Sequence, residues 1–86
     1  MNNAFKALAD PTRREILALL RNGDLNAGDI AARFRISAAS ISHHLKELTT
    51  AGLVLRERQG QHIIYSLNIT VFEEVIAWIQ GIKNRE

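Results

Sequence analysis

The chain contains no cysteine. This absence excludes disulfide bonds, thiolate metal sites and redox sensing by thiols, and it suits a reducing compartment. The sequence also lacks any apolar run near the roughly 20 residues that a membrane-spanning helix needs, and it has no charged N-terminal start followed by an apolar stretch. We therefore expect a cytoplasmic protein that does not insert into a membrane.

The net charge is small as well. Eleven Lys and Arg face nine Asp and Glu, which leaves a formal charge of +2. Such a mild bias favours an acidic partner, but many proteins that bind no nucleic acid share it. Length is more informative: 86 residues predict a single domain, residues 1–86, that buries only about 60 to 65 % of its unfolded surface. A lone core of that size is marginal, so a partner subunit is plausible.

The only proline marks the first boundary between helices. A short helix capped by Asn2 or Asn3 must end before Pro11, because the residue before a proline avoids helical geometry. Asp10 as N-cap and Pro11 at the first helical position then begin a second helix, which ends near Gly23.

The middle of the chain predicts a helix-turn-helix. Asn26 with Asp29 three residues later resembles a capping box for a helix over residues 27–34. After a tight turn at residues 35–37, Ser37 caps a second helix that runs from Ala38 to about Thr50. This order is typical of proteins whose second helix enters the major groove of DNA.

Two strands and a final helix follow. Residues 53–58 and 62–67 are rich in β-formers, and Gln59-Gly60 supplies the turn. Thr70 with Glu73 then begins the last helix. The expected fold is mainly α (α+β): a dimeric winged helix-turn-helix with five helices and a two-stranded β-hairpin wing between helices four and five.

The helix over residues 38–50 has two different sides. At about 100° per residue, Ile41, Leu45 and Leu48 share an apolar side that faces the core. The opposite side is small, polar or basic, which suits contact with base edges and phosphates, and it carries Ala39, Ser42, His43 and Lys46. A merely solvated surface is the alternative, which the preceding turn and the following basic hairpin make less attractive.

The histidines predict neither a metal site nor catalysis. His43 and His44 point about 100° apart on a helix and cannot share one ion, and His62 adds only a distant nitrogen. We expect His44, beside the apolar side, to pack and to hydrogen-bond locally. Ser42 and His43 diverge by the same angle with no acid to orient the imidazole, so we expect no enzyme, no catalytic residue and no cofactor.

The hairpin is basic and polar. Arg56 and Arg58 project from one face of their strand, with Gln59, Gln61 and His62 around the tip. Such a wing can reach the adjacent minor groove or the phosphates. Alternatively, its charges only protect an edge strand from aggregation.

The two ends of the chain predict a dimer interface. The last helix is apolar over a wider arc than one core contact requires, and the first helix adds two more apolar residues. The predicted interface residues are Phe5, Leu8, Val71, Phe72, Val75, Trp78, Ile79 and Ile82. A monomer with a broad apolar base is one alternative, and a protein-interaction module that docks a partner on the last helix is another.

Several motif blocks, in the right order over nearly the whole chain, resemble the ArsR/SmtB family of bacterial winged-helix repressors, and in particular its short autorepressors without metal sites. The blocks are Ala9-Asp10-Pro11-Thr12-Arg13-Arg14, Ser37, Ser42-His43-His44-Leu45-Lys46-Glu47-Leu48, Ala51-Gly52-Leu53-Val54, Arg58-Gln59-Gly60 and Tyr65-Ser66-Leu67.

The resemblance implies a homodimeric, sequence-specific repressor of transcription that binds double-stranded DNA at a palindromic, inverted-repeat operator. Its first and last helices would form the interface, with helix four in the major groove and the hairpin as wing. Together with the reading of the residues, it implies that the DNA-binding residues are Ser37, Ala38, Ala39, Ser40, Ser42, His43, Lys46, Arg56, Arg58, Gln59 and His62.

The departures from the family pattern concern metal sensing. Metal-sensing members have cysteines where this chain has residues 25–29, which contain none. Acidic and histidine ligands would be expected in the last helix where this chain has Ile69, Val71, Ile82 and Arg85. We therefore expect metal-independent regulation, with a protein anti-repressor, protein concentration or an unidentified ligand as the signal.

Overall fold

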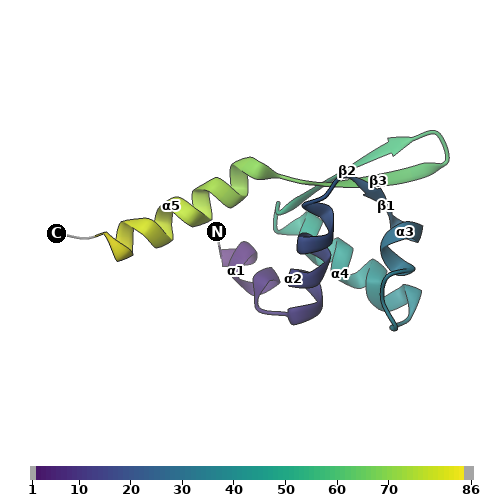
Figure 1. Ribbon diagram of the computed structural model, residues 1–86, viewed down its shortest axis with the longest axis horizontal. Coiled ribbons are helices and arrows are strands. Elements are labelled where there is room, and N and C mark those ends of the chain that lie inside the picture. The colour runs from purple at the N-terminus through teal and green to yellow at the C-terminus, as the bar shows by residue number, and fades with distance from the viewer. Residues whose placement is uncertain (1, 85–86) are drawn as a thin grey trace.

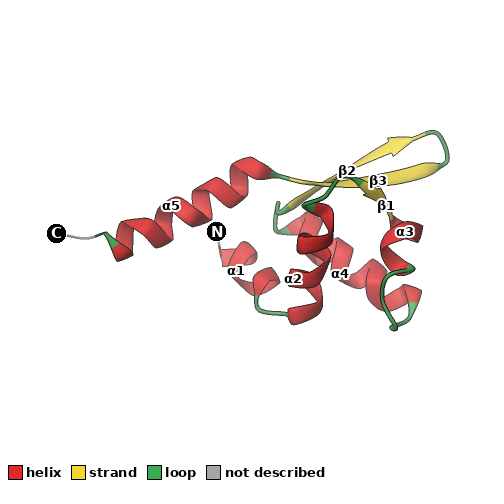
Figure 2. Ribbon diagram, in the orientation of Figure 1, coloured by secondary structure: helices red, strands yellow, loops and turns green. Residues whose placement is uncertain are grey.

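The winged helix-turn-helix fold is confirmed. The computed structural model describes residues 2–84, so Arg85 lies outside the described residues. Within them, five helices accompany a three-stranded antiparallel sheet (Figures 1 and 2). In chain order the elements are α1 (Asn2–Leu8), α2 (Pro11–Leu20), β1 (Leu25–Asn26), α3 (Ala27–Ala31), α4 (Ala38–Thr50), β2 (Val54–Gln59), β3 (His62–Leu67) and α5 (Ile69–Lys83).

Three of the predicted helix caps are present. Asp10 accepts a hydrogen bond from the backbone N–H of Arg13 at 3.0 Å, and Ser37 accepts one from Ser40 at 3.1 Å. Asn26 accepts from the N–H of Asp29 at 2.8 Å. Each cap satisfies one of the backbone donors that the first turn of a helix leaves without an intrahelical partner. The starts of α2, α3 and α4 are therefore determined locally.

Two helix boundaries differ from prediction. α3 ends at Ala31 rather than at Phe34, because the N–H groups of Arg33 and Phe34 donate to carbonyls three residues back and tighten the chain into turns. α5 begins at Ile69, with Asn68 rather than Thr70 at the N-cap position. The N–H of Asn68 donates to the carbonyl of Leu53 at 3.0 Å, so a tertiary contact sets this start.

The sheet contains a strand that the sequence did not predict. β1 pairs with β3, opposite Ile64 and Tyr65, so the strand order is β1-β3-β2 rather than a two-stranded hairpin. Two residues are too few for an alternating pattern, which explains the missed strand.

The turn of the wing is displaced by one residue from the prediction. Gln59 pairs with His62, so the loop is Gly60-Gln61 rather than Gln59-Gly60. Gly60 has a φ of +62°, which suits the first position of a two-residue hairpin turn.

The core lies between α2, α4 and the sheet. Its fully buried large side chains include Ile41, Leu45 and Leu48, as predicted for the apolar side of α4, together with Ile16, Ile30, Leu53 and Val54. α5 instead extends beyond the body of the protein, past α1 (Figure 1), and contributes only Val75 to the buried residues. Within residues 2–84, none of the helices has both the length and the apolar character needed to cross a membrane.

Candidate nucleic-acid interface

The polar side of α4 is displayed to solvent. Ser42, His43 and Lys46 are all exposed, as are Ala38 and Ala39 near the start of the helix. Ser37 and Ser40 are already engaged with each other, since the Ser37 hydroxyl donates to Ser40 Oγ at 3.1 Å while it caps the helix. These two serines are therefore held at the N-terminus of α4, while Ser42, His43 and Lys46 face the solvent.

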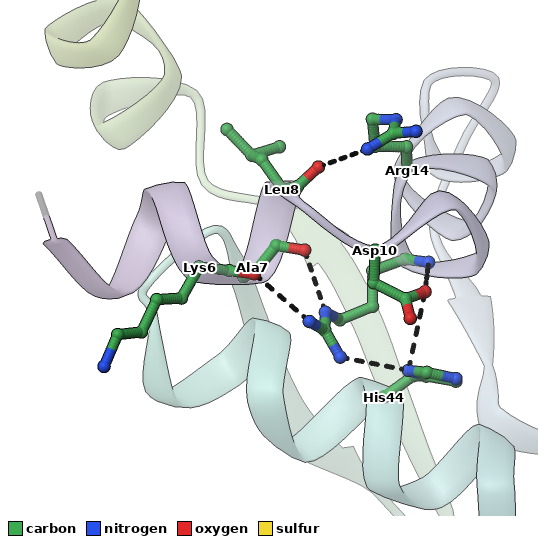
Figure 3. A network of polar contacts seen from close by, with 7 residues as sticks. Lys6, Ala7, Leu8, Asp10, Arg14 and His44 are labelled. Atoms are coloured by element: carbon green, nitrogen blue, oxygen red, sulfur yellow. Dashed lines mark hydrogen bonds and ion pairs between the residues drawn. The ribbon is translucent and has the colours of Figure 1, made fainter.

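A polar network fixes α4 against the first two helices (Figure 3). His44 Nδ1 lies 3.3 Å from Nη1 of Arg13 and 4.0 Å from Oδ1 of Asp10, and the His44 side chain is only 15 % exposed. The backbone N–H of Arg13 holds the pKa of the Asp10 carboxyl below its usual value, and the charges of His44 and Arg13 act in the same direction against desolvation. The network orients α4 from behind its exposed side.

His44 packs as predicted, but its polar contacts are not local. They come from Arg13, 31 residues away, and from Asp10 at the N-cap of α2. A helical-wheel argument places a side chain on one side of its own helix and says nothing about which other element that side meets. The expectation of a local hydrogen bond was therefore wrong.

Arg13 and Arg14 have a positioning role that sequence reasoning missed. Arg13 Nε donates to the carbonyl of Ala7 at 2.8 Å and Nη2 donates to that of Lys6 at 3.1 Å. Arg14 Nη1 donates to the carbonyl of Leu8 at 2.6 Å (Figure 3). Cationic side chains at the C-terminal end of a helix satisfy its last carbonyls. The sequence signal for this role was the position of two adjacent arginines shortly after the end of α1, within reach of its last carbonyl groups.

The wing carries its polar residues outward. Arg56, Arg58, Gln59 and His62 are all exposed. Arg58 Nε donates to the carbonyl of Gly60 at 3.2 Å, so its guanidinium lies back along the turn. Gln59 Nε2 donates to Glu57 Oε1 at 3.3 Å on the strand face opposite the two arginines.

A cleft of about 340 Å³ joins the helix to the wing. It brings together Ser42 and Lys46 of α4 and Arg56 of β2, three residues predicted to bind DNA. His43 and the wing-tip residues do not line it. Sequence reasoning missed three other lining residues, Thr49, Thr50 and Tyr65. The two threonines follow Lys46 by three and four residues, a spacing that places side chains on one side of a helix.

The exposed apolar residues at the chain ends form a second surface. Phe5 is 36 % exposed and Trp78 is 49 % exposed, and their ring centroids are 5.3 Å apart. Of the other residues predicted for a dimer interface, Ile79 and Ile82 are exposed and Leu8, Val71 and Phe72 are half-buried.

Val75 differs from these residues. It is only 6 % exposed and packs in the core of its own chain, so it supports the apolar surface from behind. Conversely, Ile69 and Ile76 are exposed but were not predicted for the interface. Both line a hollow of about 380 Å³ between α2 and α5.

The structure offers little for metal binding. Among residues 2–84, no three His, Asp or Glu side chains gather closely enough to hold an ion. His43 and His44 have ring centroids 5.8 Å apart, tilted by 55°. His44 is already in contact with Arg13 and Asp10.

The chain is similar to known regulators. The model of the arsR family of bacterial regulatory proteins matches residues 10–55. The transcriptional repressor SdpR of Bacillus subtilis is 54 % identical over 85 residues, which are 99 % of this chain and 94 % of that protein. The crystal structure of an ArsR family transcriptional regulator gives a TM-score of 0.89 at 30 % identity, covering 95 % of this chain and 90 % of the other.

A second solved structure is similar over nearly the whole chain. It is the homodimeric winged helix-turn-helix DNA-binding domain of a possible ArsR-family regulator from Mycobacterium bovis. The TM-score is 0.78 at 27 % identity, and the match covers 99 % of this chain and 79 % of that one. Because the family match includes α4 and the winged-helix fold is shared, this chain belongs to the ArsR family of bacterial regulatory proteins, which are transcriptional regulators that bind DNA.

Proposed function

We propose that this protein is a homodimeric transcriptional repressor that binds an inverted-repeat operator. The observation that carries the proposal is the exposure of Ser42, His43 and Lys46 on α4, a helix that the Asp10–Arg13–His44 network holds in a fixed orientation. A rigidly held helix with small and polar outward residues fits the major groove. The similarity to the B. subtilis repressor supports the direction of regulation.

The apolar surface at the chain ends supports the homodimer. Trp78, Ile79 and Ile82 are about half exposed on a helix that extends away from the core. Large exposed apolar patches on small proteins usually mark an interface. The similar domain from M. bovis is homodimeric. Two-fold symmetry would place two copies of α4 about 34 Å apart, one turn of duplex, which is why the operator is proposed to be an inverted repeat.

Regulation is proposed to be independent of metal ions. The chain has no cysteine, and residues 2–84 show no metal-binding cluster. The signal that releases the operator is then a protein anti-repressor, the protein's own concentration or a ligand other than a metal ion. The proposal places the protein in the cytoplasm, where a bacterial chromosome lies.

A footprint on the DNA upstream of the gene tests the proposal. Protection of a palindrome is expected, unchanged by a chelator or by added zinc. With two or three phosphates neutralised per subunit, log K against log salt should have a slope of about −4 to −5. Zinc-dependent release would contradict metal independence. An absence of salt-sensitive duplex binding, together with capture of a partner protein on α5, would favour a protein-interaction module instead.

A further inference from the structure

The cleft between α4 and the wing is built from two aligned rows of side chains. Arg56 of β2 is paired directly with Tyr65 of β3, so their side chains share one face of the sheet. Ser42, Lys46 and Thr49 follow each other at helical spacing and form the opposite wall. Because both walls belong to regular elements, the separation between them is fixed by the fold.

Tyr65 has an unusual environment for a polar side chain. The residue is only 8 % exposed, but it lines the cleft, and its hydroxyl makes no hydrogen bond to another side chain or to the backbone of residues 2–84. No side-chain oxygen or nitrogen in that range is both buried and without a partner, so the hydroxyl is open to solvent in the cleft. A tyrosine whose ring is largely buried usually gives its hydroxyl a hydrogen-bond partner, either within the protein or outside it. The hydroxyl is therefore available to donate a hydrogen bond to a molecule that enters the cleft.

The chemistry of the lining residues points to an anion. Lys46 and Arg56 supply two positive charges, and none of the acidic residues that the structure describes lines the cleft. Ser42, Thr50 and Tyr65 add hydroxyl donors. Thr49 is different, because its hydroxyl already donates to the carbonyl of Leu45 at 2.8 Å and is not available to a ligand. Cations with several hydroxyl donors are typical of phosphate contacts.

We propose that this cleft binds a phosphate of the DNA backbone and that the Tyr65 hydroxyl donates to it. The inference rests on the proposed DNA-binding function. When α4 occupies the major groove and the wing reaches the adjacent minor groove, the sugar-phosphate strand that separates the two grooves must cross between them. The cleft lies at that crossing, so Tyr65 positions the protein on the duplex without reading sequence.

The test compares Tyr65→Phe with Thr70→Val as the control, because Thr70 is exposed on α5 and does not line the cleft. Both substitutions remove one hydroxyl and nearly preserve side-chain shape, and melting temperatures confirm that both variants fold. Tyr65→Phe should weaken binding by roughly tenfold, by the same factor for the operator and for an unrelated duplex, because a phosphate contact carries no sequence information. Thr70→Val should bind like the wild type.

A neutral methylphosphonate at each backbone position near the groove crossing identifies the phosphate. At the phosphate that Tyr65 contacts, the modification removes the charged acceptor of the hydroxyl. A duplex modified there should therefore bind the wild type and Tyr65→Phe with equal affinity. Arg56→Gln should also flatten the salt slope by about 2 for a dimer, since two phosphates lose their cation.

Several results would overturn the inference. If the wild type binds the duplex and Tyr65→Phe binds equally well, the hydroxyl makes no contact. A loss confined to the operator would make Tyr65 a base-reading residue. A shift of the Tyr65 ring signals by millimolar inorganic phosphate, without DNA, would make the cleft a site for small anions instead. If even the wild type binds no duplex, the proposed function itself fails.

Discussion

The rings of Phe5 and Trp78 meet with their centroids 5.3 Å apart and their planes inclined by 59°. The contact joins α1 to α5, the two elements at opposite ends of the sequence. Tilted aromatic pairs at this separation are favourable beyond the area that they bury. Because both rings remain partly exposed, they form one composite surface and a natural centre for the proposed dimer interface.

Trp78→Ala should weaken the proposed dimer. Tryptophan is enriched among residues that dominate interface energetics, and a hot-spot loss of about 2 kcal/mol weakens association by roughly 30-fold. Sedimentation velocity over a concentration series measures the effect. Gln80→Ala, on the polar side of the same helix, is the control and should associate like the wild type. A Trp78→Ala protein whose dimer dissociation constant equals that of the wild type would place the interface elsewhere.

His43→Ala and Lys46→Ala should weaken operator binding and leave association intact. Loss of a base contact at His43 should reduce discrimination between operator and unrelated duplex by about 1 to 3 kcal/mol. Loss of Lys46 should weaken binding to both duplexes and lower the magnitude of the salt slope by about 2 for a dimer. Fluorescence anisotropy with both duplexes separates the two effects. Unchanged affinity in both variants would show that α4 does not contact the operator through these residues.

Gly60→Ala should destabilise the protein by about 1 kcal/mol, since a residue with a Cβ adopts a left-handed backbone only at that cost. Gly60 has a φ of +62°, and a Cβ built there meets no atom within 4 Å, so the loss would come from the backbone and not from a clash. Urea unfolding measures it. Gln61→Ala, at the neighbouring turn position, should have little effect. Equal stability of both variants would mean that the turn relaxes freely.

Asp10 should make part of the stability depend on pH. The N–H of Arg13 lowers the pKa of the folded Asp10 carboxyl below its ordinary value, so the unfolded state binds the proton more readily. The contribution is therefore fully present above about pH 4, the ordinary range of the carboxyl, and is lost as the pH falls through the lowered pKa.

Asp10→Asn is the informative variant for this effect. Asparagine caps a helix about as well as aspartate but does not titrate, so unfolding free energies measured between pH 3 and pH 7 should vary less than in the wild type. Asp10→Ala removes the cap as well and should cost about 1 kcal/mol at neutral pH. An identical pH profile for the wild type and Asp10→Asn would show that this carboxyl is not responsible.

The local elements could be predicted from the sequence. Asp10, Asn26 and Ser37 cap helices because their side chains bond to backbone groups three residues away, and Ile41, Leu45 and Leu48 share a side because the helical period is fixed. Interactions of that range depend only on neighbouring residues. The family resemblance and the exposed side of α4 depend on the same patterns.

Only the tertiary structure determined which helices and strands contact one another. β1 forms because β3 offers a free edge, His44 contacts Arg13 across 31 residues, and Val75 turns into the core while its neighbours on α5 remain exposed. The sequence alone shows Tyr65 only as one residue of a strand. Its place in the cleft depends on the pairing of β3 with β2, which sets Tyr65 beside Arg56, and on the packing of α4 nearby. Contacts between segments far apart in the chain depend on how whole faces pack, and no local pattern encodes them.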